Sequence, residues 1–400
     1  MGIIVDKFSS KIRFIFLYAA FMISSGYCLI AATYAGYISL PSYLFVCFYF
    51  FLVGHGSAAS YAAAMGTNVR NWDNKHHGFA IGVPISCIGL SAFVFTQFAN
   101  FFYIDAILDI SSFLFFLGVI SALANVIASY CIRDVRHLKP ARITTQSEEN
   151  QNLLESEESV PLLEEVLSVE ELFPKFLSSF NAYLLALMLF IVGGCGLMYI
   201  NNVGSIILSL TAENQGTQSP KVQSLQKFHV ALISISSFLG RLIFGILSDF
   251  FIKSERFCFK KIPRVFWVGF SALVCFFGYV LGSTLGGYGT IENNRSAMQL
   301  TLCTIFIGTS YGAVNTSMPV LVGLLFGMKK YATNVGLISM FISIGSMFFS
   351  FIFSELYEMK RDSEMEYCKG QECINLTFQI SALCNIIAVF LGILIWRRCS

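Results

Sequence analysis

The sequence predicts an all-α membrane protein with ten transmembrane helices, and three observations support this fold class. Of its 400 residues, 56% are hydrophobic and only 12% are charged, which is about half the charged fraction of a typical soluble domain. Apolar runs of about 20 residues recur along the chain, and each is long enough to cross a hydrocarbon core about 30 Å thick. The runs are continuously apolar, whereas barrel strands alternate, and a helix satisfies its own backbone hydrogen bonds in lipid.

The apolar runs place four helices before a long polar break and six after it. The predicted spans are residues 14–36, 41–64, 78–101, 110–132, 181–208, 228–250, 265–285, 300–326, 332–355 and 374–396. Pro84 and Pro319 fall inside spans, where proline is expected to kink a helix.

The distribution of lysine and arginine predicts the orientation of the helices. Of the 26 Lys and Arg residues, 19 fall in one set of loops and 6 in the opposite set. Because positively charged loops stay on the cytosolic side, we expect both termini and the polar break to lie in the cytosol.

The polar break at 133–178 divides the chain into a four-helix part, 1–132, and a six-helix part, 179–400. Its middle is acidic, rich in serine and poor in aromatic residues, a composition that favours a largely disordered linker.

A sorting motif lies within this linker. Glu158, Leu162 and Leu163 fit the acidic dileucine pattern E-x-x-x-L-L, which sorting adaptors read in cytosolic segments. In fungi such signals direct membrane proteins to the vacuole, so we expect a vacuolar membrane location with an adaptor as a partner.

The loops on the opposite side carry features of an oxidising, glycosylating compartment. Asn294 and Asn375 each begin an N-x-S/T glycosylation sequence. Cys368 and Cys373 lie beside the second of these, and a disulfide between them is expected in an oxidising lumen.

The composition also argues against several other classes of function. With a net charge of +2 and no basic stripe, the chain is not expected to bind nucleic acid. Most of its 12 cysteines lie inside apolar runs and show no metal-ligand spacing, so we expect neither a metal nor a cofactor. No ATP-binding signature is present, and no cluster of intramembrane His, Asp or Glu suggests a membrane-bound transferase. The chain is therefore not predicted to be an enzyme.

A short internal repeat links the two parts of the chain. The segment from Gly2 to Asp6 recurs as the segment from Gly245 to Asp249, and basic residues and then a span follow each copy. Six spans separate the copies, which is the layout of a twelve-helix carrier built from two six-helix halves.

These features make the chain resemble the major facilitator superfamily, and within it the fungal monocarboxylate-transporter-like and nodulin-like proteins. The resemblance covers nearly the whole chain in order. Besides the repeat, it is carried by HHGFAIGVPISCIGLSAFVFTQ (76–97), SVPLLEE (159–165), GLMYINNVGSI (196–206), GRLIFGILSDFF (240–251) and YGAVNTSMPVL (311–321).

The resemblance implies a helical bundle whose ten spans correspond to family helices three to twelve, with the first two family helices absent. It implies a secondary carrier that moves a small organic solute, such as a monocarboxylate, with protons as a candidate coupling ion. The alternative is a transport-inactive fragment, or a non-transporting membrane sensor of the same fold.

Arg241 is the first candidate for substrate binding. It lies near the middle of its predicted span, where a charged residue normally faces a cavity or a partner. Animal monocarboxylate transporters carry an arginine at the matching position that is implicated in holding the substrate carboxylate. Ser237 stands where the family has an aspartate, which puts proton coupling through this helix in doubt.

Four further polar residues within the spans are candidates for the substrate pathway. Paired asparagines in a membrane helix need hydrogen-bond partners, and we expect them to unwind the helix locally. The candidates are Tyr199, Asn201, Asn202 and Asn315.

The residues of the repeat are candidates for gating. A carboxylate at the cytosolic mouth can pair with a loop cation or with the positive N-terminus of a neighbouring helix. We expect Gly2, Asp6, Gly245 and Asp249 to hold the two halves together on one side of the membrane.

Overall fold

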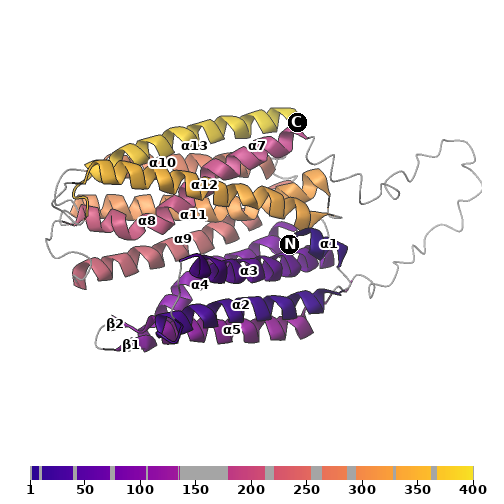
Figure 1. The fold of residues 1–400 in the computed structure, drawn as a ribbon. Coiled ribbons are helices and arrows are strands. Elements are labelled where there is room, and N and C mark those ends of the chain that lie inside the picture. The colour runs from indigo at the N-terminus through magenta and orange to yellow at the C-terminus, as the bar shows by residue number, and fades with distance from the viewer. Residues whose placement is uncertain are drawn as a thin grey trace, which may run out of the picture.

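A computed structural model describes most of the transmembrane region. The described residues are 2–8, 11–38, 43–72, 77–104, 107–133, 135, 179–211, 220–253, 264–285, 294–327, 330–361 and 367–399. Within them, ten helices are long and apolar enough to cross a membrane, which confirms the predicted fold class. The helices lie side by side, and both ends of the chain are at the same end of the bundle (Figure 1).

The first part of the chain contains a short helix and four long ones. These are α1 (Gly2–Lys7), α2 (Ile12–Tyr34), α3 (Leu44–Asn71), α4 (His77–Ala99) and α5 (Ile110–Cys131). A 3₁₀ turn, η3 (Asn100–Phe102), and a hairpin of two-residue strands, β1 (Tyr103–Ile104) and β2 (Ile107–Leu108), join α4 to α5. Asp109 then begins α5, because its side chain accepts a hydrogen bond from the backbone N–H of Ser112 at 3.3 Å.

The second part contains six membrane-length segments. The first of them is α7 (Phe180–Met188), a π-helical turn η5 (Leu189–Gly193) and α8 (Gly194–Leu210) in continuous succession. The other five are α9 (Pro220–Lys253), α10 (Arg264–Ser283), α11 (Asn294–Phe326), α12 (Tyr331–Met359) and α13 (Glu372–Cys399).

Several helices are longer than their predicted spans. The helix α9 begins at Pro220 and α11 at Asn294, whereas the apolar pattern placed their starts at 228 and 300. Hydropathy detects only the part of a helix that lipid surrounds, and polar turns continue beyond it. Proline at the first position of α9 suits a helix start, because its missing N–H would have no intrahelical partner there.

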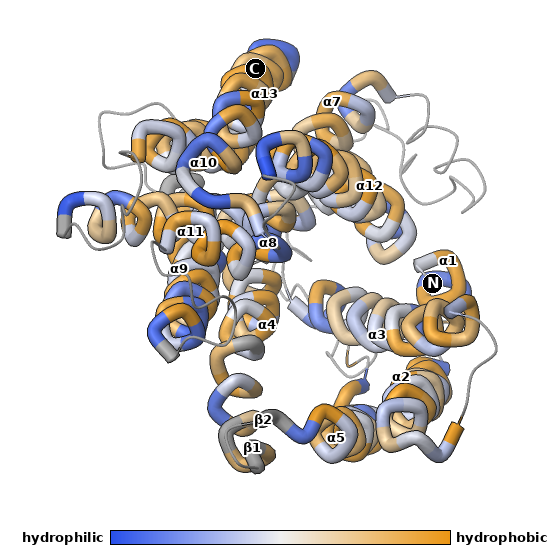
Figure 2. Tube along the Cα trace, turned by 60° about the vertical axis from the view of Figure 1, so that its left-hand side comes forward, coloured by the Kyte–Doolittle hydropathy of each residue, from blue (hydrophilic) through white to orange (hydrophobic). Residues whose placement is uncertain are grey.

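The first four long helices do not form one compact group. The helix α2 packs against α3 and α5, whereas α4 packs mainly along α9 and also contacts α11. Figure 2 shows α4 beside α9 and apart from α2 and α5. The division of the chain at 133–178 stays a prediction, but in space α4 belongs with the helices that follow that break.

Glycines allow the closest helix contacts, as is typical of membrane bundles. At the crossing of α12 with the segment η5–α8, Gly345 lies directly against the backbone of Phe190, and an added Cβ on Gly194 would lie 2.6 Å from Gly345. Neither backbone can move away without separating the two helices. This crossing therefore requires glycine on α12.

We predict that Gly345→Ala destabilises the protein by about 1–3 kcal/mol, the usual effect of overpacking a well-filled contact. Gly336→Ala is the matched control on the same helix, since an added Cβ there meets no atom within 4 Å. That variant should be neutral or slightly stabilising, because alanine has the higher helix propensity. Thermal unfolding in detergent measures both, and equal melting temperatures would contradict this account of the crossing.

Candidate functional site

Arg241 lies buried where α9 meets α4. Its side chain is only 5% exposed, and its Nη1 donates a hydrogen bond to the backbone carbonyl of Ile85 on α4 at 2.9 Å. The guanidinium fits there because α4 carries Gly89, where an added Cβ would lie 2.8 Å from Nη1. The buried Nε has no hydrogen-bond partner among the described residues. We call this contact between α4 and α9 the α4–α9 seam.

Two tyrosines accompany the guanidinium. The ring of Tyr311 on α11 lies 5.7 Å from the guanidinium carbon, within the range of a cation–π interaction. Tyr61 on α3 also interacts electrostatically with Arg241. In the described part of the chain, no carboxylate pairs with Arg241. Among the described residues, its positive charge is therefore balanced by a carbonyl dipole and two phenol groups.

Two cavities lie beside Tyr61. A small one of about 20 Å³ is lined by Tyr61 and by Asn315 on α11. A larger one of about 520 Å³ lies between α3 and α12, and Tyr61 lines it together with His55 and Tyr331. Arg241 is not among the lining residues of either cavity. Tyr61, Val335 and Ser339 line both cavities, and of these Tyr61 also interacts electrostatically with Arg241.

The structure brings one of the four other predicted pathway residues near Arg241. Asn315 donates from Nδ2 to the carbonyl of Tyr311 at 2.7 Å, so it lies one helical turn from the ring that covers the guanidinium. Its role as a substrate ligand stays a prediction.

The other three residues lie on α8 and have partners elsewhere. The hydroxyl of Tyr199 is 2.7 Å from Oγ1 of Thr304 in the core. Asn201 donates to Ser346 on α12 at 3.4 Å, and Asn202 donates to the carbonyl of Met198 at 2.8 Å. None of the three makes a hydrogen bond or ring contact with Arg241 within the described residues.

The expected unwinding at the paired asparagines was wrong. The helix α8 is regular from Gly194 to Leu210, and the irregular turn is η5, which lies before it. An asparagine amide that donates to the carbonyl four residues earlier, as Asn202 does, satisfies its polar group without breaking the helix.

At the end of the bundle that carries the termini, α1 is docked on α12. Oδ2 of Asp6 accepts hydrogen bonds from the backbone N–H of Thr333 at 2.8 Å and from its Oγ1 at 2.7 Å. Thr333 is the third residue of α12, so the carboxylate lies at the positive end of that helix. Gly2 lies against the backbone of Ala332 at the same contact. Asp6 and Gly2 thus join α1 to α12, and their role in gating stays a prediction.

The second copy of the repeat lies on another helix. Gly245 contacts α4, where an added Cβ on Gly82 would lie 3.4 Å from the Cα of Gly245. Asp249 lies four residues from the end of α9, and its side chain is outside the described residues. A gating role for Gly245 and Asp249 stays a prediction.

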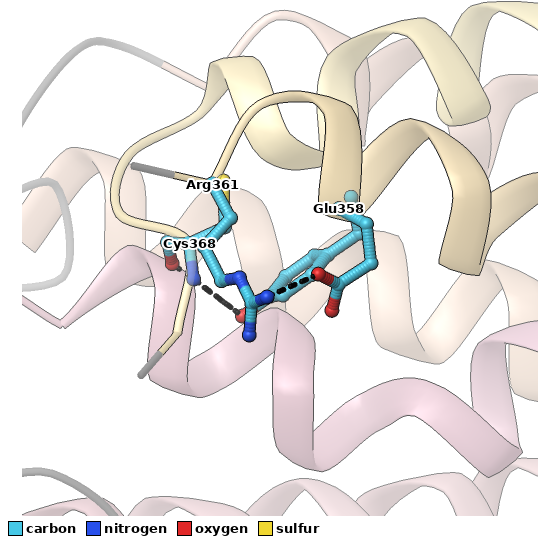
Figure 3. A network of polar contacts seen from close by, with 4 residues as sticks. Glu358, Arg361 and Cys368 are labelled. Carbon is cyan, nitrogen blue, oxygen red and sulfur yellow. Dashed lines mark hydrogen bonds and ion pairs between the residues drawn. The ribbon is translucent and has the colours of Figure 1, made fainter. Parts of the chain in front are cut away.

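The opposite end of the bundle carries the predicted disulfide. Cys368 and Cys373 are joined, with their Cα atoms 6.0 Å apart. The backbone N–H of Cys368 donates to the hydroxyl of Tyr357 at 3.2 Å, and Arg361 pairs with Glu358 at 2.7 Å nearby (Figure 3). The disulfide prediction is confirmed.

The expectation that both glycosylation sequences lie in loops was wrong. Asn294 is the first residue of α11, and Asn375 lies in the first turn of α13. Thr377 of the second sequence is 1% exposed. The sequence pattern placed the starts of these two helices too late, because their first turns are polar.

The sorting motif of Glu158, Leu162 and Leu163 lies outside the described residues, so it stays a prediction.

Sequence reasoning did not identify Tyr61 or the carbonyl of Ile85. Tyr61 is one of 17 tyrosines, and nothing in its local pattern separates it from those that face lipid. A backbone acceptor has no sequence signal. Another missed group is His229 on α9, whose Nδ1 is 2.8 Å from Oγ1 of Thr304 in the buried core.

Comparisons with known proteins agree with this architecture. A family model described as Major Facilitator Superfamily matches residues 1–350. A protein named "Probable transporter mch1" from Emericella nidulans is 24% identical, over 99% of this chain and 77% of the relative. "Probable transporter MCH1" from Saccharomyces cerevisiae is 26% identical, over 88% of this chain and 71% of the relative.

A solved structure supports the fold alone. The chain is similar to a bacterial homologue of the iron transporter ferroportin in an outward-facing state, with a TM-score of 0.58 and 11% sequence identity. The similarity covers 98% of this chain and 86% of that one. The family model and the curated relatives confirm the resemblance that the sequence motifs predicted.

The docked carboxylate of Asp6 predicts a pH dependence. Burial raises the pKa of this carboxyl above 3.8, although the hydrogen bonds from Thr333 and the charge of Arg70 lower it. A raised pKa in the folded protein means that folding favours proton uptake, so this contribution to stability is present at low pH and lost as the pH rises through the folded-state pKa.

We therefore expect wild-type protein to gain thermal stability relative to Asp6→Asn as the pH falls from neutral to about 4. The asparagine variant has no titrating group at this position and serves as the reference at every pH. Parallel melting curves, or a relative loss by the wild type in acid, would show that Asp6 is not buried at the start of α12.

Proposed function

Because the chain belongs to the major facilitator superfamily, we propose that this membrane transporter is a secondary carrier that moves a small organic anion, such as a monocarboxylate, by alternating access. The observation that carries the proposal is the buried charge of Arg241, which has no carboxylate partner within the described residues. A charged group inside a membrane bundle persists when water, a partner or a ligand solvates it. A substrate carboxylate fits this role.

The chemistry of the guanidinium favours a carboxylate. Its planar fork can donate two parallel hydrogen bonds to the two oxygens of one carboxylate. In the structure one donor is used by Ile85, while Nε is buried without a partner. An anion that reaches the α4–α9 seam would satisfy Nε and would replace the single carbonyl contact with a charged one.

The contact between α1 and α12 supports alternating access. In the proposed cycle, Asp6 closes the end of the bundle that carries the termini, and its hydrogen bonds to Thr333 break when that end opens. A few hydrogen bonds of about 1–3 kcal/mol each suit a gate that must open repeatedly. Gly245 and Asp249 would form the second, pseudo-symmetric part of the same gate.

We predict that Arg241→Lys lowers uptake of short-chain monocarboxylates by reconstituted vesicles at least about tenfold. Lysine keeps the charge but loses the planar fork. Arg13→Lys is the matched control, because Arg13 also lies over a tyrosine ring, that of Tyr130 at 4.4 Å, and its uptake should equal that of the wild type.

Undiminished uptake by Arg241→Lys would contradict the proposal. Equilibrium binding to the purified protein separates the alternative function. Carboxylate binding that depends on Arg241, without vesicle uptake, would indicate a sensor or an inactive carrier of the same fold.

For location, we propose the vacuolar membrane with both termini cytosolic, on the basis of the acidic dileucine motif and the distribution of basic residues. Replacing both Leu162 and Leu163 by alanine should redirect a fluorescently tagged protein to the plasma membrane, because the adaptor would lose its apolar anchor. Replacing Val166 and Leu167, an apolar pair in the same linker without a glutamate four residues before it, is the control and should leave the location unchanged. An unchanged location in the first double variant would remove this support.

A further inference from the structure

Tyr61 occupies a position between the cavities and the buried charge. It lines both the cavity of about 520 Å³ and the smaller one that contains Asn315. It also interacts electrostatically with Arg241 and with Tyr311. Among the described residues that line either cavity, Tyr61 is the one that interacts electrostatically with Arg241.

The hydroxyl of Tyr61 is available for a ligand. Within the described residues no hydrogen bond of this hydroxyl is found, unlike those of other tyrosines in the bundle. The hydroxyls of Tyr199 and Tyr279, for example, are bonded at 2.7 Å and 2.6 Å in the core. A half-buried hydroxyl beside a buried cation is a strong donor to an anion, because a hydrogen bond to a charged acceptor is worth more than a neutral one.

A second buried donor lies beside the same space. Tyr331 on α12 is 2% exposed, lines the larger cavity, and its hydroxyl has no hydrogen-bond partner in the described part of the chain. It interacts electrostatically with Tyr61. A buried hydroxyl without a hydrogen-bond partner costs free energy. A ligand in the cavity that accepts a hydrogen bond from Tyr331 would remove this cost, which favours a binding site over a packing defect.

The two other phenols near Arg241 are less suited to the role. Tyr311 presents its ring to the guanidinium, so its π face, rather than its hydroxyl, is committed to the cation. Tyr331 shows no electrostatic interaction with Arg241. Of Tyr61, Tyr311 and Tyr331, only Tyr61 both lines the cavity of about 520 Å³ and interacts electrostatically with Arg241.

We propose that Tyr61 is a substrate-binding residue whose hydroxyl donates a hydrogen bond to the carboxylate that Arg241 holds. This inference rests on the proposed function, and it adds a specific consequence. Tyr61 lies on α3 and Arg241 on α9, so one anion joins the two parts of the chain. Occupancy of the site would then draw α3 toward α9.

The test compares a carboxylate with its uncharged amide. Equilibrium binding is measured on the purified full chain with monocarboxylates from acetate to hexanoate, and then with the amide of the tightest ligand. Tyr61→Phe removes only the hydroxyl, and it should weaken carboxylate binding at least about tenfold while changing amide binding much less. Tyr49→Phe makes the same change on the same helix, away from the cavities, and should bind both ligands as the wild type does.

A second variant separates loss of the donor from loss of structure. Tyr61→His retains an N–H donor on an aromatic ring and should recover part of the carboxylate affinity. Non-additive losses in the double variant Tyr61→Phe with Arg241→Lys would show that both residues contact one ligand group.

Each remaining outcome is decisive. Wild-type carboxylate affinity in Tyr61→Phe, equal losses for carboxylate and amide, or no recovery in Tyr61→His would overturn the role of Tyr61. If Arg241→Lys also binds carboxylates normally, or if the wild type binds none of them, the proposed function fails as well. If Arg241→Lys loses carboxylate affinity and Tyr61→Phe does not, the proposed function stands and only the role of Tyr61 is overturned.

Discussion

The structure depends on one unusual interaction, a buried guanidinium that joins two helices and has no carboxylate partner in the part of the chain that the structure describes. Arg241 reaches from α9 to the carbonyl of Ile85 on α4, and Tyr311 covers its face. Gly89 provides the space for it. Because dipoles and π electrons stabilise a charge in this position only in part, an anion is the substrate that we propose for this site. This contact is part of the packing of α4 along α9 and α11, which follow the linker, rather than on its sequence neighbours α2 and α5.

The contacts at the two ends of the bundle differ in kind. The disulfide between Cys368 and Cys373 is covalent, and the hydrogen bond from Gly370 to the carbonyl of Ser209 at 2.8 Å ties the same loop to the end of α8. At the opposite end, α1 is held to α12 by a carboxylate and a helix terminus. Contacts of the second kind are reversible, and a buried carboxylate makes them sensitive to pH.

Much of the fold could be predicted from the sequence, because continuous apolar runs determine where helices cross lipid. The ten spans, the disulfide and the position of Arg241 within a span follow from pattern and chemistry alone. Helix ends were less accurate, since the polar first turns of α9 and α11 carry no hydropathy signal. The partners of Arg241 could not be predicted. A carbonyl at Ile85, a phenol at Tyr61 and the packing of α4 on α9 depend on three-dimensional contacts between segments more than a hundred residues apart in sequence.

The most direct test of the central claim is an experimental structure of the protein with a bound monocarboxylate, at a resolution that shows the guanidinium and its neighbours. The account predicts that the carboxylate lies within hydrogen-bonding distance of Arg241, about 2.7–2.9 Å, and that the Nη1 bond to Ile85 is lost or shared. A ligand bound elsewhere in the bundle, with Arg241 still bonded to Ile85 as in the ligand-free protein, would contradict it.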